Sequence, residues 1–203
     1  ECRANILKEL RELGLLVKEV PYINNIGYSE RTNSIIEPKL STQWFCKMNE
    51  LAKPAINVVT NNQIKFYPDK YKNIYLHWMN NIKDWCISRQ LWWGQRIPAY
   101  YIDNGEYVVA KDIEEAYIIF KQKYPDLSIT DLKQDEDVLD TWFSSWLWPI
   151  SSFGGIHDNN NEELKYYYPI NVLVTAPDII FFWVARMIMF GLYWKNEIPF
   201  EKV

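Results

Sequence analysis

Hydrophobic residues recur at helical spacing in several stretches of the chain. The stretch "ANILKELRELGLL" predicts a helix with one buried side that ends at Gly14. The stretch "TQWFCKMNELAKPAI" at 42–56 predicts a second helix, with Ser41 as its N-cap. Residues 17–39, between these helices, contain prolines, a glycine and paired asparagines, which favour an extended ribbon with turns.

The middle of the chain alternates between strand and helix patterns. Residues 64–68 predict a short strand, and 70–82 predict a helix. Two β-rich runs flank Asn104-Gly105, which predicts a hairpin, and 112–124 form an amphipathic pattern typical of a helix capped by Asp112. The acidic and aromatic stretch "DEDVLDTWFSSWLWP" fits a loop that enters a helix.

The clearest pattern lies near the C-terminal end. "NVLVT" at 171–175 is typical of a parallel strand buried on both faces, and the next residues predict a helix with Pro177 in its first turn. In open α/β sheets, ligands lie beyond the carboxyl ends of strands, at helix N-termini. Asp178 could accept hydrogen bonds from ribose hydroxyls there, and Ile179 and Trp183 could wall a small apolar pocket. Alternatively, Asp178 only complements the helix dipole and Trp183 belongs to the core.

Composition indicates a globular chain of 203 residues, 48% hydrophobic, with ten tryptophans that must be buried or contact a flat ligand. A net charge of -4 excludes a general nucleic-acid coat. Three widely spaced cysteines indicate neither a disulfide framework nor a zinc ribbon, and they favour a reducing, cytoplasmic environment. The apolar stretch at 179–194 contains Arg186 and is too short to span a bilayer, so we expect a buried helix. Residue 1 is Glu, so we expect the chain to be a piece of a longer protein, and we expect no signal peptide.

Several polar residues are candidates for chemistry. Asp137 and Asp140 could act as paired carboxylates in a glycosidase, although runs of acids are more often solvated turns. The two histidines have no ligand partner at metal spacing, so we expect them at the surface. In "DWCISRQLWWG" at 84–94, Arg89 and Gln90 lie among three tryptophans and need buried partners.

Three stretches carry a family resemblance: "DWCISRQLWWGQRIPAYY", "QDEDVLDTWFSSWLWP" and "VLVTAPDIIFFWVARMIMFG". In this order they resemble the second half of the catalytic domain of the valyl-tRNA synthetases, which are class I aminoacyl-tRNA synthetases. "GYSERTNSIIEPKLSTQWF" at 27–45 is similar to the stretch that leaves the inserted editing domain of that family. The resemblance implies an α/β fold: residues 1–60 as the C-terminal part of the editing insertion, and 61–203 as the second half of a Rossmann-like nucleotide-binding domain.

The resemblance also implies roles for residues. Trp142, Ile179 and Trp183 match positions that enclose the valine side chain. Thr175, Ala176 and Asp178 match the segment that contacts the adenylate. Arg89 and Gln90 would lie in or beside the cleft, or act structurally, with Trp85, Trp92 and Trp93 packed around them.

The parent enzyme would join valine to its tRNA with ATP and magnesium, in the cytoplasm, as a monomer. The His-Ile-Gly-His and Lys-Met-Ser-Lys-Ser signatures that hold the ATP phosphates in the family are absent from these 203 residues. We therefore expect no catalytic residue in this piece and no activity from it alone. Cysteine-pair zinc knuckles of relatives are also absent, so we expect no bound metal. Ala176 stands where the family usually has glycine, and its methyl group would crowd the nucleotide.

A different class of function is an aromatic-rich module whose exposed tryptophans stack on sugars or single-stranded bases. Such a module requires several coplanar exposed rings, whereas the synthetase interpretation places most tryptophans in the core or in one cleft.

Overall fold

The computed structural model describes residues 2–30 and 32–203, so Arg31, inside the predicted ribbon, lies outside the described residues. The chain divides into two compact units, Glu1–Thr42 and Gln43–Val203. This division falls before the boundary predicted near residue 60, and the assignment of residues 1–60 to an editing insertion stays a prediction.

The first unit contains helix α1 (Cys2–Glu12), and Gly14 after it has a φ of 66°, as the predicted helix stop requires. The predicted buried side of this helix is wrong: Ile6 is 53% and Leu13 is 69% exposed. In its described residues this unit has no sheet and no second helix against which those side chains could pack, and Tyr28 and Ile35 form one isolated β-bridge.

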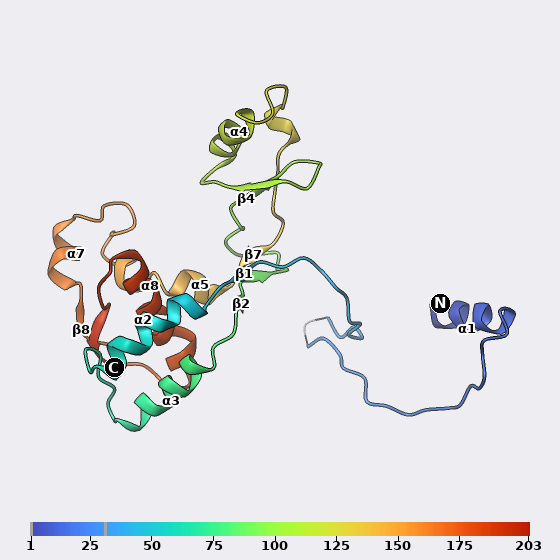
Figure 1. Cartoon of the computed structure of the whole chain (residues 1–203), viewed down its shortest axis with the longest axis horizontal. Helices are drawn as coiled ribbons and strands as arrows, with labels where there is room; N and C mark the ends of the chain where they lie inside the picture. The colour runs from blue at the N-terminus through green and yellow to red at the C-terminus, as the bar shows by residue number, and fades with distance from the viewer. Residues whose placement is uncertain (1, 31) are drawn as a thin grey trace. The chain divides into compact units, whose positions relative to one another are not determined.

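The second unit is built around helix α8 (Ala185–Trp194), whose residues from Ala185 to Gly191 are all buried. Helix α2 (Asn49–Thr60) lies beside α8, and α3 (Lys70–Asn80) packs on α2 (Figure 1). The predicted helix at 70–82 is therefore confirmed. The main core joins these helices with side chains from the rest of the unit, including Phe66, Trp85, Trp146, Leu164 and Phe200.

The helix predicted with Ser41 as its N-cap begins seven residues late, with Met48 at the N-cap position. Strand β1 (Phe45–Cys46) pairs antiparallel with β2 (Trp85–Cys86), and only after Met48 does the chain become helical. The backbone N–H of Trp44 donates to Ser88 Oγ at 2.9 Å, and that of Met48 donates to Asp84 Oδ1 at 3.2 Å. Pairing with a distant segment has overridden the local cap signal.

The second unit also contains a smaller core. Strand β4 (Ala99–Tyr101) is the middle of a three-stranded antiparallel sheet, between β5 (Tyr107–Val109) and β6 (Lys133–Gln134). The predicted hairpin is confirmed, and Gly105 has a φ of 85° in its turn. The 3₁₀ turn η1 (Ile129–Asp131) precedes β6.

The helix predicted after the hairpin is also confirmed. Helix α4 (Ile113–Lys121) is capped by Asp112, whose Oδ1 accepts a hydrogen bond from the Glu115 N–H at 2.9 Å. Its inner face packs Ala116 and Phe120 on the sheet.

Short elements connect the two cores. Strand β3 (Ser88–Arg89) pairs antiparallel with β7 (Val138–Leu139). Three short helices follow: α5 (Thr141–Ser145), α6 (Trp148–Ser151) and α7 (Glu162–Tyr167). The acidic and aromatic stretch predicts a loop that enters a helix, and the passage from β7 into α5 confirms it.

Strand β8 (Ile170–Val172) pairs in parallel with β9 (Phe200–Lys202), which confirms a parallel strand before the predicted helix. The segment predicted as a strand at 64–68 joins this edge through an isolated bridge from Lys65 to Lys202. Burial of the 171–175 run on both faces is wrong, because Val172 is 52% and Val174 is 88% exposed. In the described chain, β8 is hydrogen-bonded to one strand, β9. The mixture of helices and strands confirms the predicted α/β class.

The helix after β8 has three parts: the 3₁₀ turn η2 (Pro177–Ile179), the π-helical turn η3 (Ile180–Val184) and α8. Pro177–Trp194 is long and apolar enough to cross a membrane by length and composition alone. The burial of the α8 residues in the main core is typical of the core helix of a globular domain.

Candidate functional site

The candidate site begins where β8 leads into η2. As predicted, Asp178 lies in the opening turn of a helix after a parallel strand, although β8 ends at Val172, three residues earlier than predicted. Asp178 and Ala176 are exposed, and Thr175 is half-buried. Ala176 has extended backbone angles, φ −78° and ψ 144°, so its methyl group causes no backbone strain. The junction therefore presents a carboxylate to solvent.

A pocket of about 310 Å³ lies next to this junction. Its lining consists of Trp142, Ser145, Trp148, Ile179 and Trp183. The predicted convergence of Trp142, Ile179 and Trp183 on one cavity is therefore confirmed, although 37 residues separate the first two. Aromatic and branched walls suit a small apolar side chain. That the pocket binds valine stays a prediction.

Hydrogen bonds and ring contacts fix the pocket walls. The Trp183 indole N–H donates to the backbone carbonyl of Ser145 at 3.0 Å, and the rings of Trp148 and Trp183 lie 5.6 Å apart. The Ser145 hydroxyl donates to the Thr141 carbonyl at 2.8 Å. The polar groups of Ser145 and Trp183 are thus satisfied by α5, which leaves an apolar surface for a ligand.

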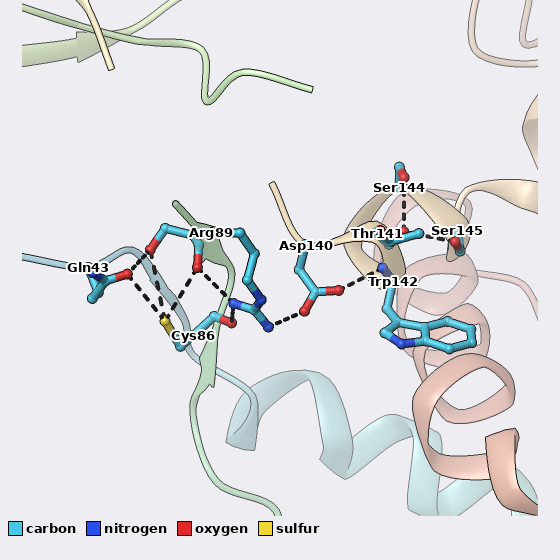
Figure 2. Close-up of polar contacts among 9 residues, drawn as sticks. Gln43, Cys86, Arg89, Asp140, Thr141, Trp142, Ser144 and Ser145 are labelled. Carbon is cyan, nitrogen blue, oxygen red and sulfur yellow. Dashed lines mark hydrogen bonds and ion pairs between the residues drawn. The ribbon is translucent and has the colours of Figure 1, made fainter. Parts of the chain in front are cut away.

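The position of α5 depends on Arg89 and Asp140 (Figure 2). Arg89 Nη1 donates to the carbonyls of Cys86 at 2.8 Å and Ser88 at 2.7 Å, and Nη2 forms an ion pair with Asp140 Oδ2. The other carboxylate oxygen, Asp140 Oδ1, accepts the Trp142 backbone N–H at 2.7 Å and caps α5. Arg89 therefore holds the start of α5, one residue from a pocket wall.

Gln90 and Gln43 continue this polar chain away from the pocket. The Gln90 side-chain amide donates to Gln43 Oε1 at 3.1 Å and to the carboxylate of Asp137. Gln43 Oε1 also accepts the Ser88 hydroxyl at 2.7 Å. Arg89 and Gln90 are both satisfied by protein groups, and a contact with substrate stays a prediction for each.

The tryptophans of the 84–94 stretch behave differently from expectation. Trp92 and Trp93 are fully exposed at 107% and 92%, so their predicted packing around Arg89 and Gln90 is wrong. They lie between β3 and β4, directly before Gly94. Trp85 is buried, and its ring stacks on the guanidinium of Arg186, 3.5 Å from the ring centroid.

The two carboxylates of the glycosidase hypothesis, Asp137 and Asp140, are both engaged in structural contacts, which does not favour that hypothesis. Asp140 is 7% exposed and holds Arg89, while Asp137 accepts from Gln90. Both histidines are at the surface, as predicted. Among the described residues, no group of His, Cys, Asp and Glu could hold a metal ion.

Three functional positions were missed in the sequence. Asp140 directly precedes "TWFSS", which is the position of an N-cap. It was not predicted as a cap because it was interpreted as part of an acidic run. Ser145 follows Trp142 by three residues, a helical spacing that was a sign of shared surroundings, whereas Trp148 lies six residues after Trp142 in α6 and no helical spacing relates the two.

Residues 8–203 match the family described as tRNA synthetases class I (I, L, M and V). The chain is 61% identical over 205 residues to a valine–tRNA ligase of Bacteroides fragilis, covering 100% of this chain and 23% of that protein. Similar matches are the valine–tRNA ligases of Parabacteroides distasonis, at 60% identity over 100% of this chain and 24% of that protein, and of Chlorobaculum tepidum, at 55% over 100% and 22%. The chain thus spans about a quarter of the length of these relatives.

A solved structure shares the fold. The crystal structure of Mycobacterium tuberculosis methionyl-tRNA synthetase bound by methionyl-adenylate superposes with a TM-score of 0.58 at 14% identity, over 89% of this chain and 29% of that chain.

Proposed function

Because this chain belongs to the class I tRNA synthetases, we propose that it forms the amino-acid pocket and part of the adenylate site of a valine–tRNA ligase. The observation that carries the proposal is the convergence of Trp142, Ile179 and Trp183 on one apolar pocket beside the end of β8. An aromatic module for sugars or single-stranded bases is not favoured, since the similar proteins are valine–tRNA ligases.

In the proposed reaction, a carboxylate oxygen of valine attacks the α-phosphorus of ATP, and pyrophosphate leaves. A ribose hydroxyl at the end of the tRNA then attacks the carbonyl carbon of valyl-adenylate, and AMP leaves. Trp142, Ile179 and Trp183 hold the valine side chain, and Asp178 accepts hydrogen bonds from the ribose of the adenylate. Thr175 and Ala176 place their backbone against the nucleotide.

The pocket explains a limit on selectivity. Rigid aromatic and branched walls exclude a side chain larger than valine, and one extra methylene is worth about 1–3 kcal/mol in such a pocket. Threonine has almost the shape of valine, and its weak rejection by this enzyme family is the standard illustration of why a second, hydrolytic site is needed. We propose that such an editing site belongs to the same enzyme.

We further propose that the parent enzyme is a cytoplasmic monomer that takes ATP with magnesium as substrate. Cys2, Cys46 and Cys86 are free thiols, which suits a reducing compartment. Groups outside this chain would hold the magnesium and the triphosphate.

A chimeric enzyme tests the proposal. Residues 1–203 would replace the matching segment of the Bacteroides fragilis valine–tRNA ligase, and valine-dependent exchange of pyrophosphate into ATP would be measured. We expect activity, and we expect Trp183→Ala to raise the KM for valine by about 10- to 200-fold, because a pocket wall is lost. Trp93→Ala, which removes a fully exposed ring, should leave the KM unchanged. An unchanged KM in the Trp183 variant would exclude this pocket as the valine site.

A further inference from the structure

Arg186 carries a guanidinium in the first turn of α8, inside the main core. The residue is 5% exposed. Its Nε and Nη1 atoms are buried, and neither has a hydrogen-bond partner within the described part of the chain. Buried polar groups in proteins are nearly always hydrogen-bonded, because leaving a charged donor unpaired is costly. Two N–H donors of Arg186, on Nε and Nη1, therefore lack an acceptor among the described residues.

Three aromatic rings lie close to the guanidinium. Its central carbon lies 3.5 Å from the centroid of the Trp85 ring, and the rings of Phe181 and Phe182 lie at 5.8 and 5.7 Å. Such contacts favour the positive charge, but they do not accept the in-plane N–H groups. Burial lowers the pKa of Arg186 to about 10, so the side chain stays charged at neutral pH.

Arg186 lines a pocket of about 540 Å³, a size in the range of small-molecule sites. Lys83 and Arg89 line the same pocket, and Asp84 is its one carboxylate among the described lining residues. Asp84 Oδ1 is engaged by the Met48 N–H. Arg89 is already paired with Asp140, which leaves Arg186 and Lys83 against one carboxylate in the lining and gives the pocket a net positive charge, although the net charge of the chain is -4.

Another part of the pocket lining is flat and apolar. Trp78 from α3 and Phe181 from η3 stack with their centroids 5.0 Å apart, and both line the pocket. None of the residues around this pocket lines the one formed by Trp142, Ile179 and Trp183. A ligand that uses both parts of the lining would carry an anionic group and a planar group.

We propose that this pocket binds a small phosphate-bearing molecule, with the phosphate on Arg186 and a planar group on Trp78 and Phe181. A phosphate offers several oxygens to the planar fork of donors on an arginine, and its second negative charge is matched by Lys83. A carboxylate could satisfy the same fork but carries half the charge. The proposal does not rest on the function proposed above, because Thr175, Ala176 and Asp178 do not line this pocket.

The test uses the purified 203-residue chain and calorimetric titration at constant ionic strength. Phenyl phosphate, inorganic phosphate and benzoate are the probes. We expect phenyl phosphate to bind more tightly than either of the others, because only it has both the dianion and the ring. Arg186→Met should weaken phenyl phosphate binding by about 10- to 100-fold, as expected when a charged hydrogen-bond donor is lost. Arg186→Lys should retain part of the affinity.

Two further variants serve as controls. Arg11→Met removes one positive charge from exposed helix α1 and should leave the affinity unchanged. Trp78→Ala should remove the advantage of phenyl phosphate over inorganic phosphate. Replacing an unpaired buried charge by an apolar side chain of similar length is neutral or stabilising, so the urea midpoint of Arg186→Met should not fall. If that variant fails to fold, Arg186→Lys and Trp78→Ala decide.

Several results would overturn the proposal. One is no binding of phenyl phosphate to the wild-type chain at millimolar concentration, which would instead point to a carboxylate from another protein segment as the partner of Arg186. Another is equal affinity in wild type and Arg186→Met. Tighter binding of benzoate than of phenyl phosphate would assign the site to carboxylates.

Discussion

The two carboxylate oxygens of Asp140 contact two different elements, α5 and β3. Oδ1 caps α5 through the Trp142 N–H, and Oδ2 holds the guanidinium of Arg89 on β3. The second contact joins residues 51 apart in the sequence. Because Trp142 is a pocket wall, the geometry of this pocket depends on a residue that does not line it.

Substitutions of Asp140 separate these two contacts. Asp140→Asn keeps an oxygen for the Trp142 N–H and loses the negative charge opposite Arg89. Because the Arg89 side chain is 39% exposed, this ion pair contributes little to the free energy of unfolding. Asp140→Ala loses the cap as well, typically worth about 1 kcal/mol, and leaves the donors of Arg89 short of one acceptor. In urea unfolding we expect a loss of less than about 1 kcal/mol for the first and about 2 kcal/mol for the second. Equal losses would show that the cap contributes nothing.

At the scale of elements, local signals predicted what is locally determined. The Asn104-Gly105 turn, the Asp112 cap and the helix at 70–80 each depend on neighbours in the sequence, and each was predictable. The strand pairs β1–β2 and β3–β7 were not, because each strand has two residues and takes its partner about forty or more residues away.

The pocket shows the same division. Spacing predicted that Ile179 and Trp183 share a face, since they lie four residues apart. That Trp142 joins them followed from family resemblance, because no local pattern relates residues 37 positions apart. The sequence of three helix types after Asp178 was unpredictable from periodicity, since apolar residues occupy almost every face of that stretch.

Helix α8 is packed too closely at Gly191 for any side chain. A Cβ there would lie 2.7 Å from Tyr168 Oη and 3.1 Å from the Glu197 carbonyl oxygen. Alanine gains about 1 kcal/mol over glycine in helix propensity, but overpacking a core costs about 1–3 kcal/mol. We expect Gly191→Ala to lower the free energy of unfolding by about 1 kcal/mol, measured by urea denaturation.

A double-mutant cycle identifies the cause. Tyr168→Phe removes the hydroxyl that the new methyl group would meet, so adding it to Gly191→Ala should recover part of the loss. Additive losses in the double variant would assign the effect to something other than this contact.

At the scale of the whole molecule, the two units differ in how they are stabilised. None of the described residues of the first unit is buried, whereas the second contains two hydrophobic cores. Hydrophobic burial is the main favourable term in folding, so the first unit contributes little of it.

Deleting residues 1–42 tests this difference. We expect the unfolding free energy of the remaining residues to change by less than about 0.5 kcal/mol, the range typical of surface changes. A urea titration followed by tryptophan fluorescence measures it directly, since all ten tryptophans lie in the second unit. A drop of several kcal/mol would mean that the first unit supports the cores.

We expect no valine-dependent exchange of pyrophosphate into ATP by the 203-residue chain alone. Losing a single group that stabilises charge in the transition state costs about 10²–10³ in rate, and this chain has neither phosphate-binding signature. The chimera described above is the matched positive control. Clear exchange by the isolated chain would place catalytic groups within it.

The pairing of β3 with β7 makes the intervening residues a separable cassette. The chain leaves the main core at Arg89 and returns at Val138, its direct partner in the pairing. The segment between these points has a core of its own, with Tyr100 and Phe120 inside it, and contacts Trp44 through Tyr107 and Asp135. Insertions or deletions there change the length of a segment whose two ends are paired with each other, so we expect α5 and η3 to keep their positions. We therefore expect this part of the chain to tolerate changes in length, or exchange between relatives, while the pocket of Trp142, Ile179 and Trp183 keeps its shape.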